Sequence, residues 1–148
     1  MSNAVPPTIG RYQVIAPLAT GGMGELFVAR RAGAGGFARL VVLKRLRVEL
    51  GATAGYRAMF FDEARLAARL THPNVCEVTD LEDVGDDHYL VMPYLEGVPV
   101  LGLARDVPAD AAEVRIVAGL LVQACDGLEH AHGLVGDDGA PLGVVHRD

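Results

Sequence analysis

The sequence has little of several residue types that mark particular classes of protein. Its 148 residues include no tryptophan and two cysteines, Cys76 and Cys125, which are far apart and form no CxxC pair. Disulfide frameworks and zinc sites need closely spaced cysteines, so neither is indicated. We expect both cysteines to be small core residues in a reducing compartment, and the protein to be cytoplasmic.

Positive charge is also scarce. The chain carries 13 Lys plus Arg against 19 Asp plus Glu, for a formal net charge of -6, and its cations are scattered. Because nucleic-acid binding needs clustered cations, nucleic acid is not an expected partner. All of the basic residues are arginine except Lys44. An ammonium is a compact point charge that a planar guanidinium does not replace, which makes Lys44 a candidate functional residue.

Long apolar segments are missing as well. Residues 116–125 form the longest charge-free stretch of the C-terminal half, about half of the ~20 residues that span a bilayer. The N-terminus lacks the basic and then apolar segments of a secretory signal. We therefore expect no export and no membrane segment in this part of the protein. With 51% apolar residues, the chain can still form the core of one globular unit.

Hydrophobic periodicity predicts a mixed order of strands and helices. Alternating apolar residues predict five strands, and a period near 3.6 predicts helices over residues 56–70 and from 109 to about 132. We find no internal repeat, which excludes solenoid folds. The expected order is three strands, a helix, two strands and a longer helix. The five strands are expected at residues 12–20, 25–31, 37–46, 75–82 and 88–95.

Glu63 is unusual because it lies in the middle of the apolar stripe of the helix expected at 56–70. A carboxylate in a protein interior is costly unless it is paired, so this helix face should meet a cation. The alternative is that Glu63 lies at the edge of the stripe and reaches water.

The other charged and histidine residues suggest no site. We assign no metal to the histidines, since His130 and His132 are two apart on a helix and face different sides. The loop acids are expected to be solvated charge: Asp83, Asp86, Asp87, Asp137 and Asp138.

A glycine-rich turn separates the first two predicted strands, with glycine at positions 21, 22 and 24. Such a turn lets the backbone approach a ligand closely and offers N–H groups to phosphates. Most glycine-rich hairpins are only turns, so the motif is weak alone. It becomes informative because Lys44 follows in the third strand and Glu63 in the next helix.

In this combination the sequence resembles the eukaryotic-like (Hanks-type) protein kinases, and most closely the bacterial serine/threonine kinases. The glycine-rich loop would be residues 18–26, the strand lysine Lys44 and the helix glutamate Glu63. The catalytic-loop aspartate would be Asp148, in the sequence His146-Arg147-Asp148. Residues 70–75 and 89–97 are similar to the family's post-helix turn and hinge, so the resemblance covers about residues 9–148.

The resemblance implies an α+β fold: a kinase-like small lobe with a five-stranded antiparallel sheet and one helix, then the first helices of the large lobe, ending at the His-Arg-Asp motif. The implied parts are a tail over residues 1–11, the small lobe and hinge over 12–95, and an incomplete large lobe over 96–148.

The implied activity is transfer of the ATP γ-phosphoryl to serine or threonine hydroxyls of protein substrates, with ATP and Mg²⁺. Lys44 would place the phosphates, Glu63 would orient Lys44, and Asp148 would accept the hydroxyl proton. No metal ligand is assigned within the chain. The implied ATP-binding residues are Leu18, Ala19, Thr20, Gly21, Gly22, Met23, Gly24, Glu25, Leu26, Val42, Lys44, Met92, Pro93 and Leu95.

The sequence departs from the family pattern at Ala19, where the first loop glycine is expected, and at Val42 and Pro93. It also ends at Asp148, before the family's metal-binding asparagine and DFG motif. We therefore expect the 148-residue chain alone to be inactive and prone to self-association. Two alternatives remain: a noncatalytic, pseudokinase-like ATP-binding or scaffold module, and a structural interaction domain with accidental motifs.

Overall fold

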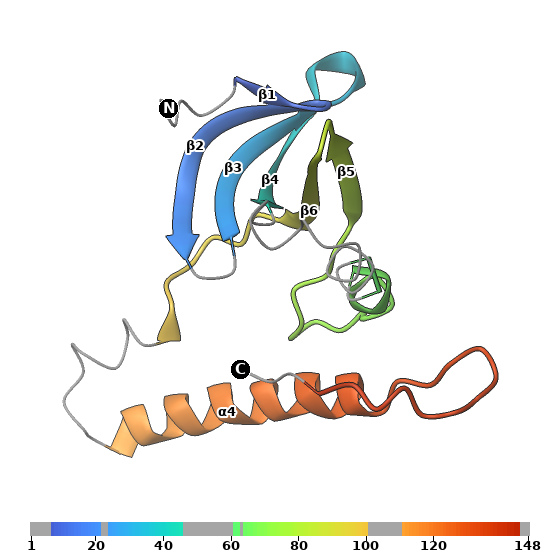
Figure 1. The fold of residues 1–148 in the computed structure, drawn as a ribbon. Coiled ribbons are helices and arrows are strands. Elements are labelled where there is room, and N and C mark those ends of the chain that lie inside the picture. Colours follow the sequence, from blue (N-terminus) through green and yellow to red (C-terminus); the bar gives the residue numbers. More distant parts are fainter. Residues whose placement is uncertain (1–6, 22–23, 46–60, 63, 101–110, 146–148) are drawn as a thin grey trace. The chain divides into compact units, whose positions relative to one another are not determined.

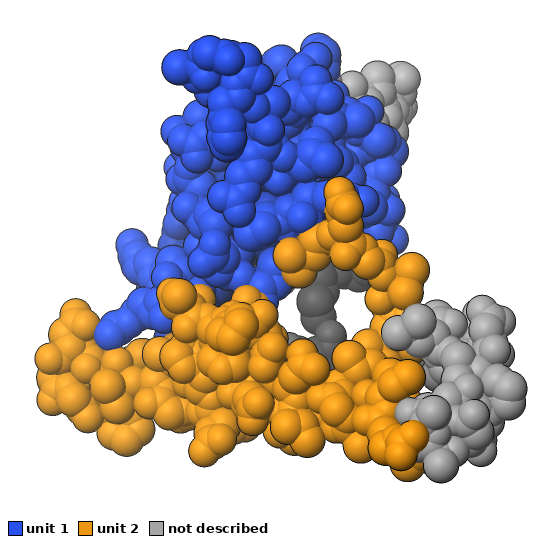
Figure 2. Space-filling view, turned by 180° about the vertical axis from the view of Figure 1, so that it is seen from behind, with its two compact units in different colours: residues 1–69, 76–94 blue, residues 70–75, 95–148 orange. Residues whose placement is uncertain are grey.

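The computed structural model describes residues 7–21, 24–45, 61–62, 64–100 and 111–145. Four residues of the predicted site, Gly22, Met23, Glu63 and Asp148, lie outside these ranges. The chain divides into two compact units, which Figure 2 colours separately. Unit 1 comprises residues 1–69 and 76–94, and unit 2 comprises residues 70–75 and 95–148. The predicted division into tail, small lobe and large lobe stays a prediction.

Unit 1 contains an antiparallel sheet of six strands in the order β1-β2-β3-β4-β6-β5 (Figure 1). The sheet has one strand more than predicted, because Thr8–Ile9 turns through Gly10, at φ 52°, and pairs with the start of the next strand. The strands are β1 Thr8–Ile9, β2 Tyr12–Gly21, β3 Gly24–Ala32, β4 Ala38–Arg45, β5 Asp80–Val84 and β6 Asp87–Pro93. A short 3-10 helix, η1, spans Ala34–Gly36 between β3 and β4.

The fourth predicted strand is displaced. It was expected at residues 75–82, whereas β5 spans Asp80–Val84 at the edge of the sheet. The alternation that predicted the strand has another cause, since Val78 packs against Leu90 in a small apolar cluster. Asp83 was expected in a loop but belongs to this edge strand, where one side of the backbone faces no partner strand and polar residues are tolerated.

One face of the sheet carries the main apolar core. Leu43 and Tyr12 are completely inaccessible there, and Val91 is 1% exposed. The β-branched and aromatic residues of alternating positions meet on this face because side chains two apart in a strand point to the same side. The core consists of Ile9, Tyr12, Phe27, Ala29, Val41, Leu43, Tyr89 and Val91.

The opposite face of the sheet carries a second, smaller apolar cluster. Residues 61–62 and 64–67 are helical, within the predicted helix 56–70. Ala64 of this helix and Leu90 of β6 form the centre of a second cluster, joined by Phe61, Val78 and Leu81. The helix therefore packs on the face of the sheet that carries Leu90, which is not the face of the main core.

Unit 2 is organised by α4, which spans Ala111–His132 and matches the long helix predicted over 109–132. Residues 70–75 pack against it at Gly127, where an added Cβ would come within 3.1 Å of the Asn74 carbonyl oxygen. His72 stacks on His130 with ring centroids 5.1 Å apart. The Asn74 N–H donates to His72 Nδ1 at 3.2 Å, which holds the turn in place.

Two predictions about burial were wrong. Cys76 and Cys125, expected in the core, are both exposed. Asp87, expected to be solvated charge, begins β6 and forms an ion pair with Arg45, with its side chain 25% exposed. Among the described residues, no helix is long and apolar enough to span a membrane.

Candidate functional site

The glycine-rich turn is the first part of the candidate site, and it joins β2 to β3. The last residue pair before the turn is Gly21 with Gly24. Gly24 has φ 138°, a backbone conformation that residues with a Cβ rarely adopt. The sequence therefore needs glycine at position 24 for the geometry of the hairpin itself.

The register of β2 and β3 is interrupted twice, between Val14 and Ala16 and between Pro17 and Ala19. Each irregularity adds one residue to β2, and such bulges bend a strand and increase its twist. The inserted residues, Ile15 and Leu18, have exposed side chains. The bulges shift the alternation of β2, so that Ala16 pairs with Val28 and Ala19 pairs with Leu26.

Lys44 belongs to a row of paired residues with members in β2, β3, β4 and β6. Ala19 pairs with Leu26, Leu26 with Lys44, and Lys44 with Leu90. Directly paired residues of an antiparallel sheet point to the same side, so these four side chains share one face. Lys44 and Leu26 are partly buried on this face.

A second row lies beside the first on the same face. Val42 is two residues from Lys44 and pairs with both Val28 and Met92. Val42 is 8% exposed, whereas Val28 and Met92 are partly buried. We call the two rows together the lysine face; it consists of Ala16, Ala19, Leu26, Val28, Val42, Lys44, Leu90 and Met92.

The lysine face is also the face on which the helix packs. Leu90, the direct partner of Lys44, contacts Ala64 of the helical segment 64–67. Glu63 immediately precedes Ala64 in the sequence but lies outside the described residues. The predicted ion pair between Lys44 and Glu63 therefore stays a prediction, and the packing of Leu90 on Ala64 is consistent with it.

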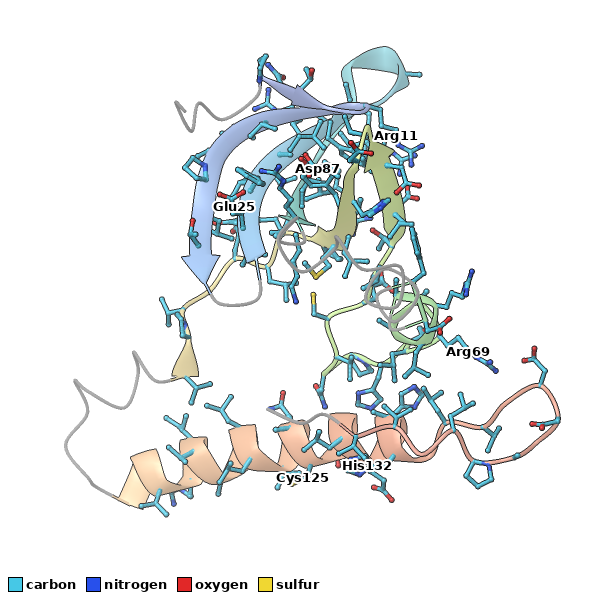
Figure 3. All side chains as sticks on the ribbon, viewed as in Figure 1. Arg11, Glu25, Arg69, Asp87, Cys125 and His132 are labelled. Carbon is cyan, nitrogen blue, oxygen red and sulfur yellow. The ribbon has the colours of Figure 1, made fainter. Side chains whose placement is uncertain are left out.

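Three of the predicted ATP-binding residues lie in rows of the opposite face. Thr20 pairs with Glu25, Glu25 with Arg45, and Val41 with Pro93. The Glu25 carboxylate accepts a hydrogen bond from Arg45 Nη1 at 3.0 Å, and Figure 3 labels Glu25 on β3. These three residues can therefore contact a ligand on the lysine face with their backbone atoms and not with their side chains.

The remaining predicted residues are in unit 2. Leu95, one of the residues implied to bind ATP, has a side chain that is 66% exposed. Residues 134–142 form a small hairpin in which the Leu142 N–H donates to the Leu134 carbonyl at 2.9 Å. This hairpin leads toward His146-Arg147-Asp148, which lies outside the described residues. Within the described part of the chain, no group of three or more His, Cys, Asp or Glu side chains could hold a metal ion.

Sequence reasoning missed part of the lysine face. Ala16, Val28 and Leu90 were not among the predicted residues, because a strand pattern does not show which residues of distant strands are paired. Two bulges in β2 further conceal the side to which Ala16 points. The signal that could have found Val28 and Leu90 is their alternation with the core residues Phe27, Ala29, Tyr89 and Val91.

Curated proteins similar to this chain include bacterial kinases, although no protein-family profile matches it. The tyrosine-protein kinase MasK of Myxococcus xanthus is 40% identical over 141 residues, which cover 94% of this chain and 22% of MasK. The serine/threonine-protein kinase pkn2 of Myxococcus xanthus is 33% identical over 139 residues, covering 94% of this chain and 15% of pkn2. The chain thus spans less than a quarter of the length of these relatives.

Solved structures show the same similarity. A double mutant of the PknI kinase domain from Mycobacterium tuberculosis superimposes with a TM-score of 0.70 at 27% identity, over 89% of this chain and 51% of that one. Another structure of the PknI kinase domain gives a TM-score of 0.65 at 26% identity, over 89% of this chain and 53% of that one. The predicted fold class is confirmed, since the antiparallel sheet matches the N-terminal lobe of these domains.

Proposed function

Because the chain belongs to the bacterial Hanks-type protein kinases, we propose that its lysine face binds ATP and that the protein transfers the γ-phosphoryl group to serine or threonine side chains of other proteins. The observation that carries the proposal is the position of Lys44. Lys44 lies on a partly buried apolar face. It pairs with Leu26, which in turn pairs with Ala19, close to the glycine-rich turn.

The lysine face suits a nucleotide because it combines apolar surface with one cation. Val28, Val42 and Met92 offer the flat apolar contact that a purine base needs. Lys44 offers a mobile ammonium to phosphate oxygens in surroundings that are partly shielded from water, where a charge pair is stronger than in bulk solvent. The hairpin at Gly21 and Gly24 can approach the phosphates without side chains in the way.

Catalysis of phosphoryl transfer depends mainly on positioning and on stabilising charge. In our proposal Lys44 positions the phosphates, Glu63 orients Lys44, and Asp148 accepts the proton of the attacking hydroxyl. Mg²⁺ would neutralise phosphate charge when bound, but none of the described residues forms a site for it, so we assign it no ligand and no step.

The serine/threonine specificity is part of the proposal, because the relatives include both specificities. MasK is named as a tyrosine-protein kinase, while pkn2 and the PknD of Chlamydia caviae are named as serine/threonine-protein kinases. Phosphoamino-acid analysis of a phosphorylated acceptor decides between them. Phosphotyrosine as the main product would refute the proposed specificity and leave the kinase activity standing.

A second candidate function is a noncatalytic ATP-binding module, and Ala19 is the residue that favours it. Its methyl group points to the lysine face, at a position where the kinase motif has glycine. The added methyl occupies space above the phosphates, which would weaken closure of the hairpin. Under this alternative the protein binds ATP and transfers no phosphoryl group.

Calorimetric titration of ATP into the purified chain tests the binding. A radiolabelled transfer assay on a complete version of the kinase domain tests the reaction, because the 148-residue chain alone is expected to be inactive. Lys44→Met should weaken ATP binding by at least about tenfold, the size of one lost charge-assisted contact. Arg39→Met is the matched control, since Arg39 is an exposed cation of the same strand. Asp148→Asn should keep ATP binding and abolish transfer.

Equal ATP affinity of the wild type and Lys44→Met would contradict the proposed site. ATP binding by the complete domain without phosphoryl transfer would favour the noncatalytic module instead. A protein that transfers phosphoryl groups after the Asp148→Asn change would remove Asp148 from its proposed role.

A further inference from the structure

Arg45, the residue after Lys44, joins three strands on the side of the sheet opposite to the lysine face. Its Nη1 donates to Glu25 Oε2 at 3.0 Å, and its Nη2 donates to both carboxylate oxygens of Asp87, at 2.8 and 3.0 Å. Glu25 belongs to β3 and Asp87 to β6, so a single guanidinium connects both neighbours of β4. Figure 3 labels the two acidic residues.

The surroundings of Arg45 make these contacts stronger than ordinary surface ion pairs. The side chains of Arg45, Glu25 and Asp87 are 32%, 28% and 25% exposed. Exposed pairs contribute little, whereas charge-assisted hydrogen bonds that are partly shielded from water are stronger and geometrically specific. Burial lowers the pKa of Arg45, but the hydrogen bond to Asp87 and the nearby acidic charges outweigh it and raise the pKa above its ordinary value.

Glu25 is the point at which this network reaches the glycine-rich hairpin. It directly follows Gly24, whose φ of 138° belongs to the turn, and it pairs with Thr20 on the other arm of the hairpin. The hydrogen bond from Arg45 to Glu25 therefore fixes the Thr20–Glu25 pair, next to the turn, in relation to β4. Because Arg45 acts from the opposite side, it leaves the lysine face clear.

We propose that Arg45 is a positioning residue for the nucleotide: by holding Glu25 against β4 and β6, it sets the height of the glycine-rich hairpin above Lys44. The inference rests on the proposed function for the identity of the ligand, but the anchoring of the hairpin is a separate claim. Lysine would not replace Arg45. Two separate nitrogens of the guanidinium donate to Glu25 and Asp87, whereas lysine has a single ammonium nitrogen.

The matched control is Arg11, which also joins two acidic residues but lies away from the hairpin. It forms an ion pair with Asp80 and another with Glu82, both on β5. Arg11→Met and Arg45→Met thus each remove an arginine with two acidic partners in the same unit. A purely structural role for Arg45 predicts that both variants lose stability and that neither changes ATP affinity.

Two measurements on the purified chain test the proposal. Hydrogen exchange followed by mass spectrometry should show faster exchange of the amides of residues 18–26 in Arg45→Met and in Glu25→Gln, and wild-type exchange there in Arg11→Met. Calorimetric titration should show ATP binding weakened about three- to tenfold in the first two variants and unchanged in the third. The double variant Arg45→Met/Glu25→Gln should be no weaker than the weaker single variant, because both remove the same interaction.

The outcomes separate the two claims. Wild-type exchange of residues 18–26 in Glu25→Gln would overturn the inference, and the near-isosteric change tests it even if Arg45→Met fails to fold. Faster exchange of residues 18–26 with no ATP binding by any variant would support the anchoring and refute the proposed function. Additive losses of affinity in the double variant would show that the two residues act independently, and would also overturn the inference.

Discussion

The sheet of unit 1 and the helix α4 of unit 2 contain similar apolar residues but bury them very differently. Leu43 is completely inaccessible and Val91 is 1% exposed, whereas Val114, Ile116 and Leu121 of α4 are 63%, 62% and 61% exposed. Apolar character therefore does not by itself tell which side chains are buried. The sheet has a core built from its own strands. In α4, Gly127 and His130 contact residues of the segment 70–75.

The largest expected difference is between a leucine of the sheet and a leucine of the helix. Leu43→Ala should lower the free energy of unfolding by about 2–5 kcal/mol, because it removes a fully buried side chain and leaves a cavity. Leu121→Ala should change it by no more than about 0.5 kcal/mol, because the side chain is mostly exposed. Urea denaturation followed by circular dichroism measures both. Similar losses would mean that α4 is buried by a partner in solution.

Two glycines of α4 offer a sharper comparison within one helix. An added Cβ at Gly127 would lie 3.1 Å from the Asn74 carbonyl oxygen and 3.2 Å from Val75 Cγ2, while at Gly119 it would meet nothing within 4 Å. Gly127→Ala should destabilise unit 2 by about 1–3 kcal/mol through overpacking. Gly119→Ala should stabilise the helix by about 0.5–1 kcal/mol. Thermal unfolding followed by circular dichroism tests the opposite signs, and a stabilising Gly127→Ala would show that residues 70–75 are not held against α4.

The smallest effect concerns pH and the core of the sheet. Burial raises the pKa of Tyr89 above its ordinary value, and the charge of Asp87 acts in the same direction. A folded-state pKa above the unfolded value adds stability that is complete below roughly pH 10 and is lost as the pH rises through the folded value. Tyr89→Phe should therefore reduce the loss of stability in urea titrations above pH 10. An unchanged alkaline slope would show that the Tyr89 hydroxyl is accessible to solvent in the folded protein.

Most strands could be predicted from sequence because their side chains alternate between two unlike faces. The predictions for β2, β3, β4 and β6 differ from the observed bounds by one or two residues. The two-residue β1 is too short to show a period, and it depends on Gly10 at φ 52°. The long helix was predicted from its 3.6-residue period. Its exposed apolar side chains were expected from the resemblance to kinases and not from the period, because a period shows which residues share a face and not what covers them.

The candidate site was only partly predictable. Lys44 stands out in the sequence as the single lysine, and the glycine-rich hairpin precedes it as a cluster of glycines at positions 21, 22 and 24. The other members of the lysine face follow from pairing between strands far apart in the chain, and Val42 meets Met92 across such a distance. Glu25 shows the opposite case, since its place beside the glycines suggested a contact with ATP, whereas its side chain binds Arg45 on the other side.

The central claim is that one face of the sheet, and not the other, binds ATP. Titration of ATP into protein labelled with ¹³C at Leu, Val and Met methyl groups tests it most directly, because the two faces carry these residues alternately along the same strands. The account predicts shifts of the methyl signals from Leu26, Val28, Val42 and Met92, with much smaller changes at Val41, Leu43 and Val91. Larger shifts at Val41, Leu43 and Val91, or no shift at saturating ATP, would contradict it.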